Sequence, residues 1–137
     1  MARPWMTVGL HLPPKPPVYA LRAALYSARA MRLESLTIWD HVQDLFPTSL
    51  WTKDFSWLAT QSRTPHDFFE FQTTLGYLAA HAGRIRLGVG VTEPVRRHPV
   101  LIAQSMATLA HFAKRAPILG IGTGERENTE PLGLSME

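Results

Sequence analysis

The chain has 137 residues, 45% of them hydrophobic and 18% charged, and this composition predicts a single domain with one modest core and little disorder. The formal net charge is only +3 and no basic run exceeds two residues, so nucleic-acid binding is not indicated. Because the chain contains no cysteine, disulfides, thiolate catalysis and cysteine-ligated zinc are excluded.

The sequence shows neither an export signal nor a membrane-spanning segment. Residues 1–5 lack the apolar stretch of a secretion signal, and no segment approaches about 18 uninterrupted apolar residues. We therefore expect a cytoplasmic protein with no transmembrane segment.

Strand-like and helix-like patterns alternate along the chain. Short apolar runs rich in strand-forming residues predict β-strands at residues 7–11, 36–39, 85–91 and 118–124. Apolar residues at helical spacing predict amphipathic helices at residues 18–32, at residues 67–82 and from Pro99 onward. The predicted order is β-α-β-loop-α-β-α-β.

The segment between the second strand and the second helix has no periodicity. Residues 42–66 scatter Trp51, Phe55 and Trp57 among polar residues and prolines. A loop of this length in a compact domain is usually functional or mobile. Its aromatic side chains suggest that it covers something apolar.

Strands that alternate with amphipathic helices predict an α/β fold with a parallel sheet and right-handed crossovers. Two architectures fit this order: a small doubly wound sheet, or the first half of a (β/α)₈ TIM barrel. A complete barrel needs roughly 250 residues, so in the second case residues 1–137 form a partial barrel that stops after about its fourth strand.

Polar residues follow each predicted strand, and the carboxyl ends of parallel strands share one edge of the sheet. Asp40 and His41 follow the second strand and are the best acid/base candidates, since histidine titrates near neutrality. Glu125 follows the glycine-rich fourth strand, where something could approach the backbone closely. An ordinary turn into a helix explains this last pattern equally well.

Other polar residues have simpler interpretations. We expect His11 to bond a backbone carbonyl, Glu93 to be solvated before Pro94, and the segment 96–98 to form a solvated loop or an anion contact. The six histidines show no HxH or HExxH spacing, so no metal site is predicted.

Three segments, in this order, resemble the luciferase-like flavin and deazaflavin oxidoreductases. They are Trp39-Asp40-His41, then Val89 to Thr92 leading to Gln104, and then the run from Leu119 to Asn128. Within the family the chain looks closest to the deazaflavin-dependent branch, in particular to the mycobacterial phthiodiolone ketoreductases. The resemblance extends from the first strand to Gly133.

The resemblance implies a (β/α)₈ barrel with a deazaflavin, coenzyme F420, bound in its mouth. It implies that His41 is the general acid that protonates the substrate oxygen, and that Glu125 assists as a second acid or base. It also implies cofactor contacts from Asp40, Val89, Gly90, Thr92 and Asn128. Val89 and Gly90 align with a strand bulge that in this family often contains a non-prolyl cis peptide behind the ring.

The function implied is hydride transfer between the reduced coenzyme and an apolar or lipid ketone, or the corresponding alcohol. Two alternatives stay open: an FMN-dependent monooxygenase of the same superfamily, and a non-catalytic remnant or association module. The later loops of such barrels carry most of the phosphate-binding contacts, so we expect this chain to bind the cofactor weakly or not at all. A half barrel also leaves strand edges unpaired, so we expect either self-association or a C-terminal half outside this sequence.

Overall fold

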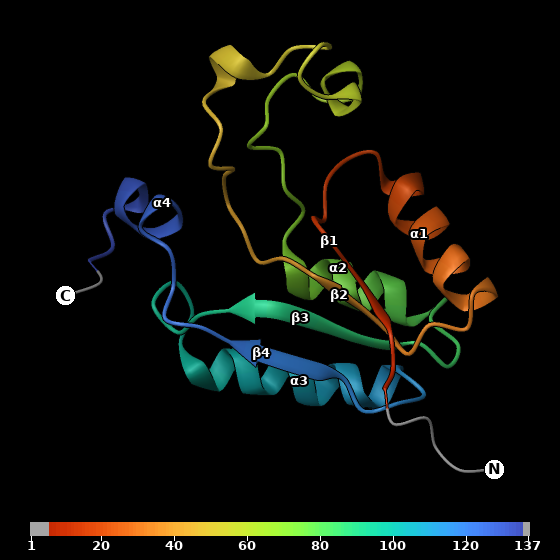
Figure 1. Cartoon of the computed structure of the whole chain (residues 1–137). Helices are drawn as coiled ribbons and strands as arrows, with labels where there is room; N and C mark the ends of the chain where they lie inside the picture. The colour runs from red at the N-terminus through yellow and green to blue at the C-terminus, as the bar shows by residue number, and fades with distance from the viewer. Residues whose placement is uncertain (1–5, 136–137) are drawn as a thin grey trace.

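The computed structural model describes residues 6–135, so the first five residues, which the export prediction concerns, lie outside it. This range holds four strands: β1 (Gly9–Leu12), β2 (Ser35–Ile38), β3 (Arg86–Thr92) and β4 (Ile118–Ile121). They form a parallel sheet in the order β1-β2-β3-β4 (Figure 1). Each strand thus lies beside the previous one in the sequence, as in a barrel. In a doubly wound sheet the strand order instead reverses, because later strands are added on the other side of the first strand. The predicted fold, the first part of a (β/α)₈ barrel, is confirmed.

The predicted alternation with helices is also confirmed. The long helices of the described range are α1 (Val18–Ala30), α2 (Phe71–Ala79) and α3 (Pro99–Phe112), and the four-residue α4 (Arg126–Thr129) follows β4. Single 3₁₀ turns occupy Thr48–Leu50, Trp57–Thr60 and Glu130–Leu132. No helix within residues 6–135 is long and apolar enough to cross a membrane.

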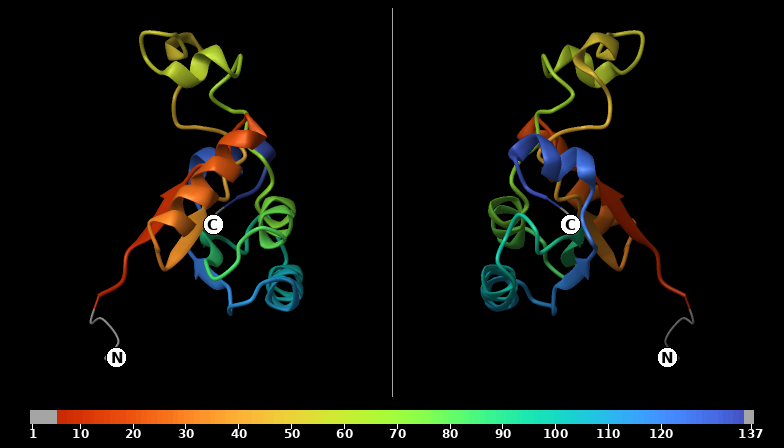
Figure 2. Two further views of the ribbon diagram at one scale, coloured as in Figure 1. Left: turned by 90° about the vertical axis from the view of Figure 1, so that its right-hand side faces the viewer. Right: turned by 90° about the vertical axis from the view of Figure 1, so that its left-hand side faces the viewer.

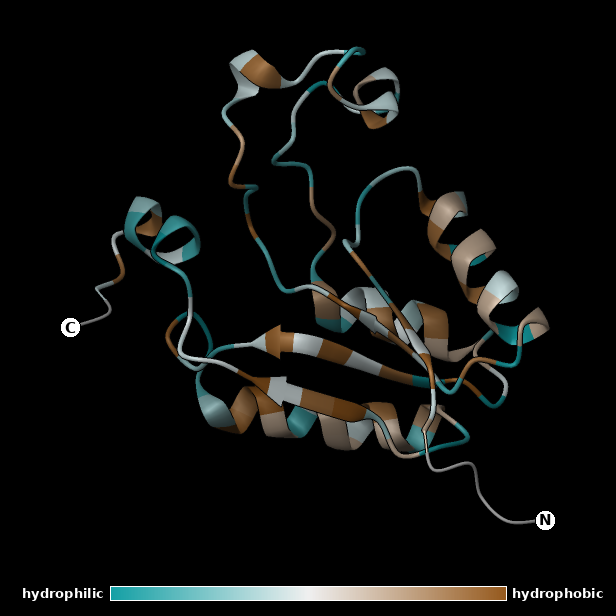
Figure 3. Ribbon diagram, in the orientation of Figure 1, coloured by the Kyte–Doolittle hydropathy of each residue, from teal (hydrophilic) through white to brown (hydrophobic). Residues whose placement is uncertain are grey.

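One face of the sheet carries the core. Leu36 and Leu87 from the strands pack with Leu25 of α1 and Leu75 of α2, and each is at most 1% exposed. Figure 2 shows α2 and α3 side by side on this face, and Figure 3 shows apolar residues along both helices and along β3 and β4. Burial of these side chains, worth about 1.5–3 kcal/mol each, fixes the helices on the outside of the curved sheet.

The opposite face carries small and polar side chains. Gly9, Ser35 and Arg86 align across the first three strands, and the next residues on this face are His11, Thr37 and Gly88. His11 is exposed here, and its Nδ1 lies 2.8 Å from the hydroxyl oxygen of Thr37. The expected bond from His11 to a backbone carbonyl is therefore wrong, because the side chain points across the sheet.

Helix α2 begins four residues later than its sequence predicts. The carboxylate of Glu70 accepts hydrogen bonds from the backbone N–H groups of Gln72 at 3.0 Å and Thr73 at 2.7 Å, which caps the helix. Residues 67–69 thereby lie outside the helix, in a segment without regular secondary structure. This places Phe68 beside the site described below instead of on the apolar face of the helix.

The cap gives Glu70 a pH-dependent role. Burial alone would raise the pKa of Glu70, but the N–H groups of Thr73 and Gln72 and the charge of Arg97 bring it below its ordinary value of 4.5. A lowered pKa means that the ionised form stabilises the fold above this value, and that the stabilisation is lost as the pH falls through the folded-state pKa.

We expect Glu70→Gln to lower the free energy of unfolding by about 0.5–1 kcal/mol near neutral pH, because glutamine offers one acceptor and no charge. On acidification below the pKa of the folded protein the difference from the wild type should disappear. Urea denaturation of both proteins over a pH series measures this. A difference that stayed constant with pH would show that the ionised cap is not its source.

Candidate functional site

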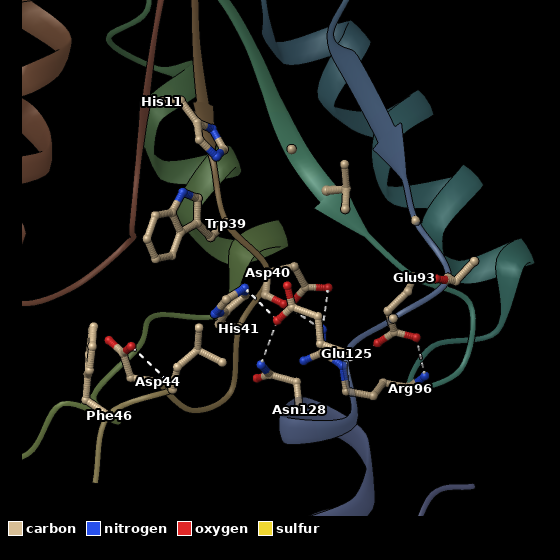
Figure 4. A pocket seen from close by; sticks show the side chains of 16 residues that line it. His11, Trp39, Asp40, His41, Asp44, Phe46, Glu93, Arg96, Glu125 and Asn128 are labelled. Atoms are coloured by element: carbon tan, nitrogen blue, oxygen red, sulfur yellow. Dashed lines mark hydrogen bonds and ion pairs between the residues drawn. The ribbon is translucent and has the colours of Figure 1, made fainter. Parts of the chain in front are cut away.

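An open cavity of about 580 Å³ lies at the carboxyl ends of the strands (Figure 4). Every strand end contributes to its wall: His11 from β1, Trp39 after β2, Gly90 in β3 and Gly122 after β4. This is the edge on which parallel α/β scaffolds place functional groups, because the loops there are held by rigid strands.

His41 and Glu125 meet at this cavity although they are far apart in the sequence. Nε2 of His41 lies 3.3 Å from Oε2 of Glu125, and the histidine side chain is 19% exposed. Nδ1 of His41 is enclosed and has no hydrogen-bond partner among the described residues. A protonated nitrogen needs an acceptor, so the hydrogen of the neutral ring belongs on Nε2, directed at the carboxylate.

Aromatic rings hold the imidazole of His41 in place. Its ring centroid lies 5.2 Å from that of Trp39 and 5.6 Å from that of Phe68, with both pairs tilted at 45°. Such packing restricts rotation of the histidine and keeps water from its enclosed side. The sequence did not point to Phe68, because its spacing fits the helix pattern of residues 67–82.

Asn128 connects Glu125 to the chain that follows β2. Its side-chain oxygen accepts hydrogen bonds from the backbone N–H groups of Val42 at 2.7 Å and Gln43 at 3.1 Å. Its amide nitrogen donates to Oε2 of Glu125 at 3.3 Å. Figure 4 shows Glu125 between His41 and Asn128. The asparagine therefore aligns the carboxylate and the histidine from the short helix α4.

Asp40 is the centre of a buried ionic network beneath the cavity. It is 5% exposed, and its Oδ2 accepts a hydrogen bond from the hydroxyl of Thr92 at 2.7 Å. The same oxygen lies 2.5 Å from Nη1 of Arg97 and 3.3 Å from Nη2 of Arg96. Arg96 also donates to the backbone carbonyl of Asp40 at 2.6 Å.

The expected solvation of Glu93 is wrong. Of the two alternatives for the segment 96–98, the solvated loop is wrong for both arginines, whose guanidinium groups contact carboxylates of the protein. Glu93 is 4% exposed and pairs with the guanidinium of Arg96. It also accepts hydrogen bonds from the backbone N–H groups of Val95 at 2.5 Å and Arg96 at 3.0 Å. The Glu93 carboxylate therefore folds back onto the loop that follows it and holds Arg96 there.

With this geometry in place, comparison with known proteins identifies the family. Residues 53–137 match the sequence model of the family described as "Luciferase-like monooxygenase". The chain belongs to this luciferase-like family. The resemblance found in the three sequence segments is therefore confirmed.

Several proteins of known type are similar to this luciferase-like chain. A phthiodiolone/phenolphthiodiolone dimycocerosates ketoreductase of Mycobacterium sp. (strain JLS) is 43% identical over 115 residues, which cover 82% of this chain and 30% of that protein. An F420-dependent glucose-6-phosphate dehydrogenase of Nakamurella multipartita is 45% identical over 62 residues, covering 44% of this chain and 18% of that protein. The chain thus spans about a third or less of the length of these relatives.

Solved structures share the fold. The coenzyme F420-dependent tetrahydromethanopterin reductase from Methanopyrus kandleri superposes with a TM-score of 0.66 at 23% identity, covering 93% of this chain and 30% of that one. An F420-dependent secondary alcohol dehydrogenase gives a TM-score of 0.62 at 22% identity, covering 92% and 34%. At this identity the likeness shows the fold alone.

The end of β3 is irregular, as the resemblance implies for the luciferase-like chain. A non-prolyl cis peptide joins Gly90 to Val91, and the β3–β4 register shifts between Val89 and Thr92. Gly90 and Val91 line the cavity. The side chains of Val89 and Thr92 are fully buried and do not line the cavity.

The long loop contributes less to the cavity than its sequence suggests. Leu45 and Phe46, near its start, line the cavity wall. Trp51 and Phe55 pack against each other with ring centroids 6.3 Å apart, and Trp57 is 63% exposed. None of these three lines the cavity, because the loop rises away from the sheet (Figure 1).

Proposed function

We propose that this chain forms one side of an active site for hydride transfer between reduced coenzyme F420 and an apolar ketone, or in reverse from the corresponding alcohol. The observation that carries the proposal is the His41–Glu125 pair, 3.3 Å apart, at the wall of a cavity large enough for a ring system. The relatives support the chemistry by name, since they include F420-dependent enzymes and a ketoreductase.

The residues at the cavity fit a flat heterocyclic ring. Gly90, Gly122 and Gly124 present backbone without side chains, and Val91 adds an apolar surface. A Cβ at Gly122 would lie 3.0 Å from Cγ2 of Val91 and would fill part of this cradle. We propose that these residues contact the ring.

Of the five residues that the resemblance names as cofactor contacts, we propose a modified role for four. Asp40, Thr92 and Asn128 use their polar atoms on protein partners, so we propose that they hold the cavity floor and the His41–Glu125 pair in shape. Val89 is part of β3, and its side chain packs in the hydrophobic core behind the cavity. Gly90 remains the residue of this group with a free approach from the cavity.

His41 is the proton donor in this proposal. Reduced coenzyme F420, when bound, supplies a hydride. A carbonyl carbon that accepts a hydride leaves negative charge on its oxygen. The imidazolium form of His41 can give its Nε2 proton to that oxygen from the cavity side and becomes a neutral ring. Nδ1 is enclosed, so the proton moves at Nε2 alone. The Glu125 carboxylate orients this N–H, and because its side chain is 52% exposed it can take up a proton from solvent and pass it to Nε2 afterwards.

The lining of the cavity favours an apolar substrate. Leu45, Phe46 and Val91 are each more than a third exposed and face the same open space. An apolar ketone would cover these side chains, whereas a sugar phosphate would leave them beside a charged group.

The test is a titration of the purified chain with oxidised F420, followed by amide NMR signals. Because the chain spans 30% of the ketoreductase length, we expect weak binding, with a dissociation constant on the order of 1 mM. Signals of Gly90, Val91 and Gly122 should shift. Gly122→Val, which fills the cradle, should abolish these shifts, while Gly76→Ala on the open side of α2 should not.

The same titration separates the alternatives. An FMN-dependent monooxygenase is the second candidate, because the matching family is described as "Luciferase-like monooxygenase". Tighter binding of FMN than of F420 at the same residues would favour it. Absence of any localised shift with either compound would leave the chain as a non-catalytic or association module and would contradict the proposal.

We propose that the complete site needs polypeptide in addition to these four strands. Within residues 6–135, β1 and β4 each pair on one side only. Leu119 and Ile121 on β4 are 40% and 61% exposed. A further part of the polypeptide or a second copy would cover them and complete the barrel.

A further inference from the structure

Lys15 is a buried cation that the proposed chemistry does not use. It lies in the proline-rich segment between β1 and α1 and is 9% exposed. Its Nζ lies 2.9 Å from Oδ2 of Asp44 and also donates to the backbone carbonyl of Pro65. Asp44 belongs to the outgoing leg of the long loop and Pro65 to its returning leg, so one ammonium group joins both.

The two legs also contact each other at this point, which we call the neck of the loop (residues 44, 65 and 66). The backbone N–H of Asp44 donates to Nδ1 of His66 at 3.2 Å. The carboxylate of Asp44 is only 11% exposed. The neck is therefore held together by the buried Lys15–Asp44 ion pair and by the hydrogen bond from the Asp44 backbone to the His66 side chain. The loop beyond the neck is largely exposed.

Lys15 is also linked to His41 by an aromatic ring that contacts both. Its Nζ lies 3.8 Å from the ring centroid of Phe68, within cation–π range. The same Phe68 ring packs against His41 with centroids 5.6 Å apart. A buried lysine, a phenylalanine and the histidine are thus in continuous contact.

We propose that Lys15 is a positioning residue of this site. By holding the neck it sets Asp44, Leu45 and Phe46 in the cavity wall, and through Phe68 it holds the ring of His41. The role of that wall and ring in hydride transfer rests on the proposed function. The positional effect itself depends only on contacts within the chain.

Loss of the ammonium should release the neck. A buried carboxylate without its cation is unfavourable, so Asp44 gains by moving into water once Lys15 is gone. Its remaining side-chain contact is the backbone N–H of the adjacent Leu45, which would move with it. Phe68 loses its cation at the same time and can tilt away from His41.

The experiment uses hydrogen exchange and NMR on the isolated chain. Lys15→Met keeps the length of the side chain and removes the charge, and Asp44→Asn removes its partner. We expect either change to speed hydrogen exchange of the backbone N–H of residue 44 by about tenfold. The double variant should exchange no faster than either single variant. Lys53→Met, at the exposed loop tip, is the matched control and should behave as the wild type.

A second readout separates positioning from mere loop stability. The ring resonances of His41 should shift or broaden in Lys15→Met and stay unchanged in Lys53→Met. Lys15→Arg should restore them in part, because it keeps the charge near Asp44. An open neck with unchanged His41 resonances would overturn the proposal, and so would a neck whose exchange stays within about twofold of wild type.

If Lys15→Met does not fold, as shown by circular dichroism, then Asp44→Asn and Lys15→Arg carry the same two readouts. No cofactor is present in these measurements. A failure of F420 to bind would therefore contradict the proposed function and leave the result for Lys15 standing on its own.

Discussion

Replacing Asp40 by alanine is expected to lower the free energy of unfolding by about 3 kcal/mol. One buried carboxylate oxygen accepts from Thr92, Arg96 and Arg97, so its loss leaves two guanidinium groups with fewer partners. The value is at the low end for a broken buried pair, because Arg96 keeps Glu93 and Arg97 keeps Glu70. Urea denaturation followed by circular dichroism measures the change.

Two variants show whether charge or shape is responsible. Asp40→Asn preserves the shape and removes the charge, and should lie between wild type and Asp40→Ala. Asp54→Ala removes an exposed carboxylate from the loop tip and should change stability by less than about 0.5 kcal/mol. If Asp40→Ala and Asp54→Ala were equally stable, the buried network would contribute nothing to the fold.

The network also shows where sequence reasoning stops. Asp40 could be recognised as a polar residue at a strand end, because the strand pattern before it is local. Its partners could not be recognised, since Arg96 and Arg97 lie on a separate loop and a solvated pair of basic residues is the commoner case. The pairing exists because β2 and β3 are neighbours, which local patterns do not encode.

The candidate acid/base pair was more accessible to sequence reasoning. His41 and Glu125 each follow a predicted strand, and strand ends in a parallel sheet share one edge, so both could be assigned to one site. Their direct contact depends on Asn128 and on the backbone N–H groups of residues 42 and 43. Phe68 was missed because the cap at Glu70, which excludes it from α2, differs from the usual capping residues.

The glycines of the third and fourth strands have a different role from the one that the sequence suggested. Glycine in a strand predicts close approach by another group. At Gly120 that group is the protein itself, since a Cβ there would lie 2.8 Å from Cγ1 of Val91 and 3.0 Å from the backbone oxygen of Val89. At Gly88 a Cβ would lie 2.4 Å from the backbone oxygen of Ile118. These glycines allow β3 and β4 to pack closely at the register shift.

Gly88→Ala is therefore expected to destabilise the chain by about 3 kcal/mol, near the upper end for overpacking. The added methyl meets the backbone oxygen of Ile118 and also its Cβ, at 2.6 Å. Side-chain rotation cannot relieve a clash with backbone, so β4 would have to move and weaken its pairing with β3. The register Gly88↔Ile118 and Val89↔Leu119 is part of that pairing.

Gly76→Ala is the matched control, because it adds the same methyl group where nothing lies within 4 Å. In the middle of α2 alanine should raise stability by about 1 kcal/mol through its higher helix propensity. Urea denaturation of the two variants should thus give changes of opposite sign. If Gly88→Ala matched the wild type, β4 would have to be displaceable at no cost, and the cavity wall formed by Gly122 and Gly124 after β4 would not be a fixed surface for a ring to lie on.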